Sequence, residues 1–259
     1  MSNFTQEAAQ TLAGKSAIVT GAGQGVGQGI AFSLAKHGAK VAVMGRTLAK
    51  VEQTAKLIQE RGGVALPLEG DVKFLADLQR CVDATVAEFG GLQIVVNNAQ
   101  QVPLGALNAV TEEALDDGWT SGPLATFRLM KIAYPHLKGD GAIINLASTA
   151  ARRWDATNYS AYAAIKEATR AFTRGAASEW GPDKIRANVI LPHAKSPGLE
   201  WWIENKPEEA AAFVKTIPAG RVGDCEDDIG EVVAFLCSDA ASYVSGQSIA
   251  VDGGQAYMP

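Results

Sequence analysis

The chain has 259 residues, 47% of them hydrophobic, which is enough for one α/β domain with a substantial core. Its net charge of −5 and the lack of a basic stripe argue against nucleic acid as the main partner. Met1–Ala13 has neither the basic nor the apolar region of a secretory signal, and no apolar run approaches membrane-spanning length. The three cysteines, Cys81, Cys225 and Cys237, are too few and too scattered for a disulfide framework or a zinc site. We therefore expect a cytoplasmic protein that binds no metal, no nucleic acid and no membrane.

Short apolar runs alternate with longer amphipathic segments along the whole chain. The expected strands lie near 16–20, 40–44, 64–68, 92–96, 141–147, 185–191 and 247–251, and helical patterns fill the gaps between them. This alternation predicts a doubly wound parallel sheet of about seven strands, covered by helices on both faces. We expect a single domain over residues 1–259.

The region from 195 to 228 interrupts this alternation. It carries three prolines, the adjacent pair Trp201 and Trp202, and a helix of mixed charge. Ligands of α/β sheets bind beyond the carboxyl ends of the strands, and this region follows the sixth strand at that end. We expect it to be a lid over a substrate, inserted before the last helix and strand.

A glycine-rich turn follows the first expected strand, Ser16–Thr20. The pattern is Thr-Gly-x-x-x-Gly-x-Gly, formed by Thr20, Gly21, Gly25 and Gly27, and a helical pattern begins at once. A strand, a glycine turn and a helix together bring backbone N–H groups and a helix N-terminus up to a phosphate group. The alternative is a turn with a structural role only.

Tyr162 lies four residues before Lys166 in an alanine-rich helical segment. Residues four apart share one face of a helix, so the two side chains are expected to project together. A neighbouring ammonium group lowers a phenol pKa from its ordinary value of about 10, which suits proton exchange with a carbonyl or alcohol oxygen. The alternative is a half-buried tyrosine beside a lysine that extends to solvent.

Together these motifs make the chain resemble the short-chain dehydrogenase/reductase family over roughly 12–254. Further short motifs follow in the family's order: Asp71-Val72, Asn97-Asn98-Ala99, Ser148, Asn188, Pro192 and Val251–Gly254. The resemblance implies a Rossmann-like fold and an NAD(P)-dependent oxidoreductase that interconverts a ketone and a secondary alcohol. In this interpretation Tyr162 is the acid/base, Lys166 tunes it and holds the nicotinamide ribose, and Ser148 binds the substrate oxygen.

The second expected strand ends at Gly45-Arg46, where dinucleotide folds usually place an acidic residue that binds a ribose hydroxyl. Gly45 leaves room, and the Arg46 guanidinium suits a 2′-phosphate, so NADP(H) is favoured over NAD(H). The alternative is a solvated arginine at the start of a helix.

The resemblance also implies a set of cofactor contacts. These are Gly21, Gln24, Gly25, Val26, Gly27, Arg46, Asp71, Val72, Asn98, Ala99, Tyr162, Lys166, Pro192 and Ser196. Asp71 is expected to accept a hydrogen bond from the adenine amino group, to cap the helix that starts near Phe74, or both. Asn97 is expected to brace the strand ends through backbone hydrogen bonds.

Three positions depart from the family pattern. The family's relay asparagine, which holds a water in a proton relay to the lysine, aligns with Gly122, which is followed by Pro123. Water or another side chain must then rebuild the relay, or the protein binds nucleotide but turns over slowly. Gln100 and His193 stand where the family usually has glycine. With Trp201 and Trp202, they are the candidate substrate contacts; the alternatives are roles in loop structure, in anchoring the lid or in a subunit interface.

Tyr159 supports a rival assignment, because it precedes Lys166 by seven residues, the spacing of the enoyl-thioester reductase branch of the same superfamily. The resemblance also implies self-association. The segments 122–137 and 159–180 are alanine-rich and the tail 255–259 is uncharged, so we expect a homotetramer, with a dimer as second choice.

Overall fold

The computed structural model describes residues 10–152 and 158–256. Residues 1–9, within the segment where no secretory signal is expected, and 257–259, the end of the expected interface tail, lie outside the described residues. The described residues form one sheet of seven strands: β1 (Ser16–Thr20), β2 (Lys40–Gly45), β3 (Val64–Glu69), β4 (Ile94–Asn97), β5 (Gly141–Leu146), β6 (Ile185–Pro192) and β7 (Ser248–Val251). All neighbours pair in parallel in the order β3-β2-β1-β4-β5-β6-β7, which confirms the predicted doubly wound sheet.

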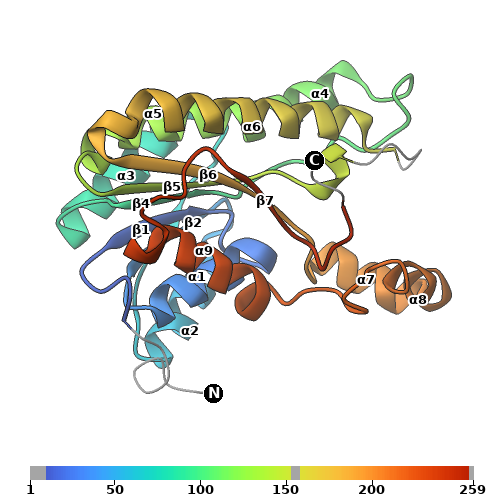
Figure 1. Cartoon of the computed structure of the whole chain (residues 1–259), viewed down its shortest axis with the longest axis horizontal. Helices are drawn as coiled ribbons and strands as arrows, with labels where there is room; N and C mark the ends of the chain where they lie inside the picture. The colour runs from blue at the N-terminus through green and yellow to red at the C-terminus, as the bar shows by residue number, and fades with distance from the viewer. Residues whose placement is uncertain (1–9, 153–157, 257–259) are drawn as a thin grey trace.

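Helices cover both faces of the sheet (Figure 1). One layer holds α1 (Gly25–Lys36), α2 (Leu48–Glu60) and α9 (Glu231–Cys237). The other holds α3 (Leu75–Phe89), α5 (Ala125–Leu137) and α6 (Ser160–Trp180), with α4 (Glu112–Trp119) continuing into α5 through a π-helical turn, η1 (Thr120–Leu124). Short 3-10 and π turns complete the chain: η2 (Thr149–Arg152), η3 (Gly181–Asp183), η4 (Cys225–Gly230) and η5 (Asp239–Ala241).

The sheet separates two apolar cores. Successive residues of β1 alternate between them, since Ala17 and Val19 pack in the core under α1 and Ile18 packs in the core under α5. Every residue of β1, β4 and β5 is buried, because helices cover both faces. This is why the central strands appear in the sequence as continuous apolar runs.

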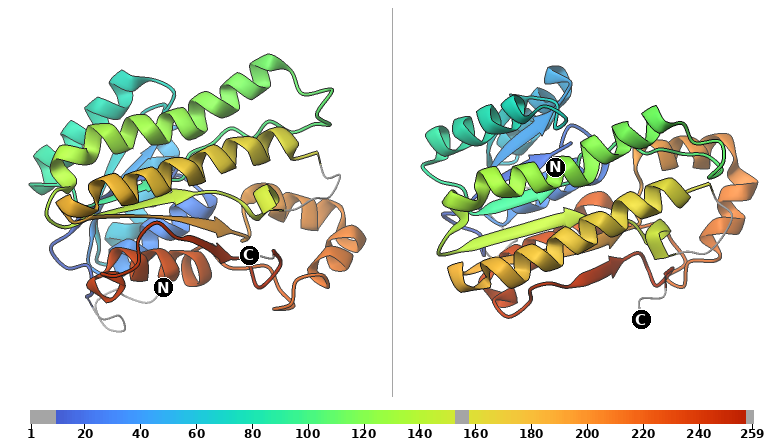
Figure 2. Two further views of the ribbon diagram at one scale, coloured as in Figure 1. Left: turned by 45° about the horizontal axis from the view of Figure 1, so that its top comes forward. Right: turned by 90° about the horizontal axis from the view of Figure 1, so that it is seen from above.

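Strand order reverses at β1, whose neighbours are β2 on one side and β4 on the other. The crossovers leave β1 and β4 in opposite directions, so their carboxyl ends border a crevice, where α/β proteins bind ligands. Beyond this end of the sheet lie α7 (Pro197–Asn205) and α8 (Pro207–Val214), which extend away from the body of the molecule (Figures 1 and 2). The segment expected to be a lid therefore lies beyond the carboxyl ends of the strands.

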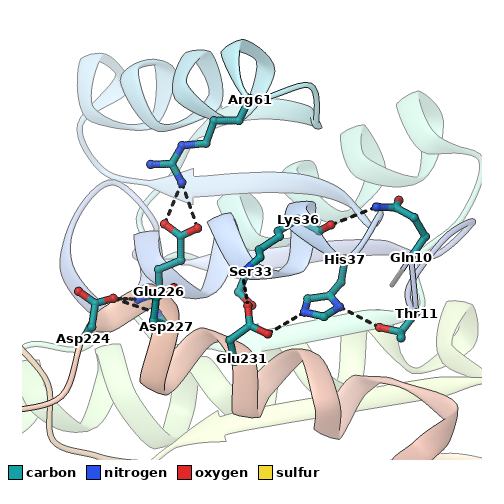
Figure 3. Close-up of polar contacts among 10 residues, drawn as sticks. All are labelled: Gln10, Thr11, Ser33, Lys36, His37, Arg61, Asp224, Glu226, Asp227 and Glu231. Carbon is teal, nitrogen blue, oxygen red and sulfur yellow. Dashed lines mark hydrogen bonds and ion pairs between the residues drawn. The ribbon is translucent and has the colours of Figure 1, made fainter. Parts of the chain in front are cut away.

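The segment that follows α8 is held against α1 and α2 by charged side chains (Figure 3). Glu231 contacts the Lys36 ammonium at 3.2 Å and the His37 ring at 2.8 Å, and Arg61 pairs with Glu226 at 2.8 Å. The backbones of α1 and η4 also lie close together. A Cβ added to Gly29 of α1 would lie 2.6 Å from Cys225 Cβ. The return of the chain from α8 is thus fixed to the helix that begins at the glycine turn.

Candidate functional site

The glycine turn leaves no room for side chains on its inner side. Gly21 and Gly25 have positive φ angles of 65° and 59°, a conformation that favours glycine. A Cβ at Gly21 would lie 2.8 Å from the Asn98 amide nitrogen, and one at Gly27 would lie 2.6 Å from the Gly21 carbonyl oxygen. The α-helix α1 starts at Gly25, so its free N–H groups open at this turn. The turn therefore fits a phosphate group of a dinucleotide.

Asn98 ties the turn to the end of β4. Its Nδ2 donates to the backbone oxygens of Thr20 at 2.9 Å and Gly21 at 3.2 Å. The backbone N–H groups of Asn98 and Ala99 donate in turn to Thr20 Oγ1. Asn97 braces the end of β4 against β5 as expected, but through a side chain and not the backbone, since its Nδ2 donates to Asn145 Oδ1 at 2.8 Å. The periodicity of a strand explains the exchange, because neighbouring residues project to opposite faces.

Five of the expected cofactor residues line one cleft at this edge: Gly21, Arg46, Asp71, Val72 and Ala99. The cleft also contains Gly45, Gly70, Gln100, Gln101 and Ser121, of which the sequence analysis missed Gly70, Gln101 and Ser121. Arg46 is exposed at the rim. Asp71 does not cap α3: its Oδ1 accepts from the backbone N–H of Lys73, and the capping position is Phe74, which makes no side-chain cap. The alternative capping role for Asp71 is therefore wrong.

A second cation, missed in the sequence analysis, stands beside the glycine turn. Lys50, in the first turn of α2, donates to Gln24 Oε1 at 2.5 Å. A Cβ at Gly23 would lie 2.9 Å from Lys50 Cβ, so α2 packs directly on the turn. Lys50 lies four residues after Arg46, and this spacing could have indicated a second cation at the same site. It was not singled out because a charged residue in a helix is ordinarily solvated.

The three predicted catalytic residues come together at the start of α6. Ser148 follows β5 and hydrogen-bonds the hydroxyl of Tyr162. Lys166 is buried, and its Nζ donates to the Leu146 carbonyl oxygen at 2.7 Å. The same nitrogen lies 5.4 Å from the centre of the Tyr162 ring. The two residues four apart therefore share a face of the helix, as predicted.

The expected direction of the Tyr162 pKa is wrong for this structure. Burial raises the pKa of Tyr162 to about 12, although the hydrogen bond from Ser148 opposes the shift. Burial also lowers the pKa of Lys166 to about 7, so at neutral pH only about half of the lysine side chains carry the positive charge that would favour a phenolate. Both shifts have one cause, because a low-dielectric environment disfavours the charged form of each group.

Tyr159 lies outside this cluster of hydroxyl groups. It occupies the position before the first residue of α6 and is 38% exposed. Its ring centre is 6.0 Å from that of Tyr162. Among the described residues, Ser148 forms its hydrogen bond with Tyr162 and not with Tyr159.

The aromatic side chains of α7 and α8 form a row with the residue that follows β6. The His193 ring packs edge-on against Phe213 of α8 at 5.4 Å, and Phe213 packs against Trp202 of α7 at 5.6 Å. Trp201 is instead 62% exposed. Histidine at 193 is thus part of the packing that holds α7 and α8.

The remaining predicted residues have mixed placements. Ser196 caps α7 by accepting from the Leu199 N–H at 3.3 Å, and it adjoins Pro197, whose Cδ would lie 3.1 Å from a Cβ at Gly25. Pro192 ends β6 opposite Val251. The side chain of Val26 is partly buried and packs against the core. Gln100 donates from its amide to the backbone carbonyl groups of Gln101 and of Gly118 in α4.

In the described ranges no helix combines the length and apolar character needed to cross a bilayer, and no group of side chains is suited to hold a metal ion.

Known proteins with similar sequence and structure carry related names. Residues 21–256 match the family model described as Enoyl-(Acyl carrier protein) reductase. The chain is 37% identical to a 12alpha-hydroxysteroid dehydrogenase of a Clostridium species, over 95% of this chain and 98% of the relative. It is 34% identical to versicolorin reductase 1 of Dothistroma septosporum, over 94% and 96%. A solved 7α-hydroxysteroid dehydrogenase, complexed with NADH and 7-oxo glycochenodeoxycholic acid, matches with a TM-score of 0.89 and 31% identity, over 96% and 97% of the two chains.

The buried lysine generates a prediction about stability. Unfolding returns the Lys166 pKa from about 7 to its ordinary range, so the unfolded chain binds more protons between these values. The free energy of unfolding should therefore rise with pH from about 7 to about 10, by at most about 1.4 kcal/mol per pH unit. Lys166→Met should lose this component. Urea unfolding of the wild type and of Lys166→Met between pH 7 and about 10 measures this component. If the free energy of unfolding depends on pH in the same way in both proteins, the lowered pKa of Lys166 is contradicted.

Proposed function

Because the chain belongs to the short-chain dehydrogenase/reductase family, an oxidoreductase family acting on CH–OH or C=O groups, we propose that it interconverts a ketone and a secondary alcohol with NADP(H). The observation that carries this proposal is the Ser148–Tyr162 hydrogen bond beside the buried Lys166. Ser148 and Tyr162 present two hydroxyl groups to one substrate oxygen. The glycine turn and the cleft at Arg46 lie at the carboxyl ends of the neighbouring strands.

The residues divide the chemistry as follows. The nicotinamide group, when bound, supplies or accepts the hydride. Tyr162 keeps its proton at neutral pH, since its pKa is about 12, and gives it to the carbonyl oxygen as charge develops there. Ser148 donates a hydrogen bond to the same oxygen. Lys166, whose pKa is about 7, returns a proton toward Tyr162. A protonated phenol suits ketone reduction.

A bulky ring ketone is the proposed substrate class. The relatives named above act on steroids or, in the case of versicolorin reductase, carry the name of another ring compound. In this chain large apolar side chains are exposed on the loop after β4, with Leu104 58% and Leu107 72% exposed. The loop adjoins the start of α6, because the Gly105 N–H donates to the Asn158 carbonyl at 3.0 Å. These side chains offer an apolar surface beside Tyr162.

Turnover of a substrate panel tests the proposal. Purified protein is given NADPH and a panel of steroid, naphthol-type and simple ketones, with loss of NADPH absorbance as the measurement. Tyr162→Phe should lower kcat by about 10²-fold or more, the usual contribution of acid–base catalysis, and leave NADPH binding near normal.

Tyr159→Phe is the matched control and should change kcat little. Nucleotide binding without turnover of any ketone or alcohol would contradict the proposed activity and would favour a dinucleotide-binding protein.

Reduction of an enoyl thioester is the second candidate. It is favoured by the description of the matching family model and by the spacing of seven residues from Tyr159 to Lys166. The exposure of Tyr159 and the Ser148–Tyr162 hydrogen bond support the ketone instead. Turnover of a crotonyl thioester that is lost in Tyr159→Phe and kept in Tyr162→Phe would reverse the order of the two candidates.

The preference for NADP(H) rests on two cations. Arg46 is exposed at the rim of the cleft, and Lys50 lies beside the glycine turn in the first turn of α2. No acidic side chain follows β2 to bind a ribose hydroxyl and repel a 2′-phosphate.

Arg46→Asp should therefore weaken NADPH binding by about 1.5–3 kcal/mol, the worth of a charge-assisted hydrogen bond, while NADH binding changes less. Lys50→Gln should have a smaller effect of the same sign. Nucleotide titrations followed by fluorescence give both constants. An equal loss for NADPH and NADH would contradict the 2′-phosphate role.

A cytoplasmic homotetramer is the proposed form. The three cysteines are free thiols, which suits a reducing compartment. Helices α5 and α6 lie side by side on one face (Figure 1), and Phe127 is 43% exposed there while packing 5.7 Å from Phe172. Light scattering should give about four times the chain mass of 27.1 kDa; the mass of one chain would contradict self-association through this face.

A further inference from the structure

The Gln100 side chain fills the place where a side chain at position 122 would begin. Gly122 is buried in η1, and a Cβ built on it would lie 2.7 Å from Gln100 Nε2 and closer still to Oε1. A side chain at position 122 could therefore enter only if the Gln100 amide moved from its place. Gln100 and Gly122 are two of the positions that depart from the family pattern, and the structure shows that they are in direct contact.

The orientation of the Gln100 amide is fixed by its partners. Nε2 donates to the backbone carbonyl oxygens of Gln101 and Gly118, each at 2.8 Å. Both partners are acceptors only, so the nitrogen must face them. The amide oxygen then faces Gly122. This atom is buried and accepts no hydrogen bond from any residue in the described ranges.

The same stretch of helix packs on α6 next to the proposed catalytic lysine. A Cβ at Gly118 would lie 2.7 Å from Ile165 Cδ1, and Ile165 directly precedes Lys166. The turn η1 contacts α6 along this line. Pro123, also in η1, has no N–H to donate within the helix, and Gln100 brings an amide donor to Gly118.

We propose that Gln100 is a positioning residue for the proton relay: from the loop after β4 it supplies the amide that Gly122 lacks, and its Oε1 holds a water that hydrogen-bonds toward Lys166. The inference rests on the proposed function for its catalytic consequence. A buried acceptor without a protein partner is ordinarily satisfied by water. In this chain the amide comes from the loop after β4 and not from the helix. The site therefore keeps an amide group although neither Gln100 nor Gly122 matches the family pattern.

The rival explanation is that Gln100 only fills space. Gln100→Met separates the two, because methionine keeps the length and volume of glutamine and removes the amide. The relay role predicts that kcat falls about 10- to 100-fold, toward the lower end of what acid–base catalysis contributes. The Kd for NADPH should stay nearly constant. A space-filling role predicts unchanged kcat.

The pH profile gives a readout that packing alone would not move. An acceptor reached through water favours the charged form of Lys166, so its removal should lower the apparent pKa of the lysine. The alkaline limb of kcat for ketone reduction should shift to lower pH in Gln100→Met. In protein labelled with ¹³C at lysine Cε, the Lys166 signal should titrate at lower pH, and this measurement needs no substrate.

Exchanging the two residues provides the rescue. In a Pro123→Ala background, which relieves the restriction on a residue before proline, Gly122→Asn should lower the Tm because it collides with Gln100. Adding Gln100→Gly should restore the Tm, kcat and the alkaline limb together. The control is Gln100→Gly with Pro123→Ala but without Gly122→Asn. This protein has no amide at either position, so its kcat should stay low.

The outcomes separate the two hypotheses. Wild-type kcat and an unchanged Lys166 titration in Gln100→Met would overturn the relay role, and so would an exchanged protein that folds with a normal Tm but stays slow. Absence of turnover in the wild type would contradict the proposed function alone, and the lysine titration would then decide the role of Gln100.

Discussion

The contact between Thr20 and Asn98 is the constraint on which the cofactor side of the site depends. It joins the ends of β1 and β4, the two strands at which the order of the sheet reverses. The Asn98 amide occupies the space above Gly21 and Gly27, so a side chain at either position would collide with it. A substitution at Asn98 would leave the Thr20 and Gly21 carbonyls without this donor and would disturb the cradle, although the side chain need not touch a ligand.

Burial of Lys166 is the constraint on which the catalytic side of the site depends. The side chain ends at the Leu146 carbonyl, the last residue of β5, and it therefore links α6 to the strand that leads to Ser148. The same burial raises the pKa of Tyr162 and lowers that of Lys166, so in the free protein both groups tend toward their neutral forms. A phenol that keeps its proton and an amine that titrates near neutral pH form a donor and its source of protons.

Local patterns account for what the sequence predicted well. The strands were placed within about two residues because both faces are covered, which makes each strand a short apolar run. The glycine turn and the Tyr162–Lys166 pair were also found, since each depends on spacing within one element. What depends on packing between elements was missed. The contact of Lys50 with Gln24 requires α2 to lie on the turn, and the direction of the Tyr162 pKa requires knowledge of its burial.

Gln100 and Gly122 show the same limit most clearly. They are separated in the chain by the loop after β4 and the whole of α4, so the sequence presents them as independent departures, one adding a side chain and one removing it. Each alone suggests damage: a crowded loop after β4, or a relay without its amide. The fold brings them into contact, and the volume added at one position is the volume lost at the other. Inferring a defective enzyme from Gly122 alone therefore has no support from the packing, because an amide is present at that point of the structure and is held by two carbonyl groups.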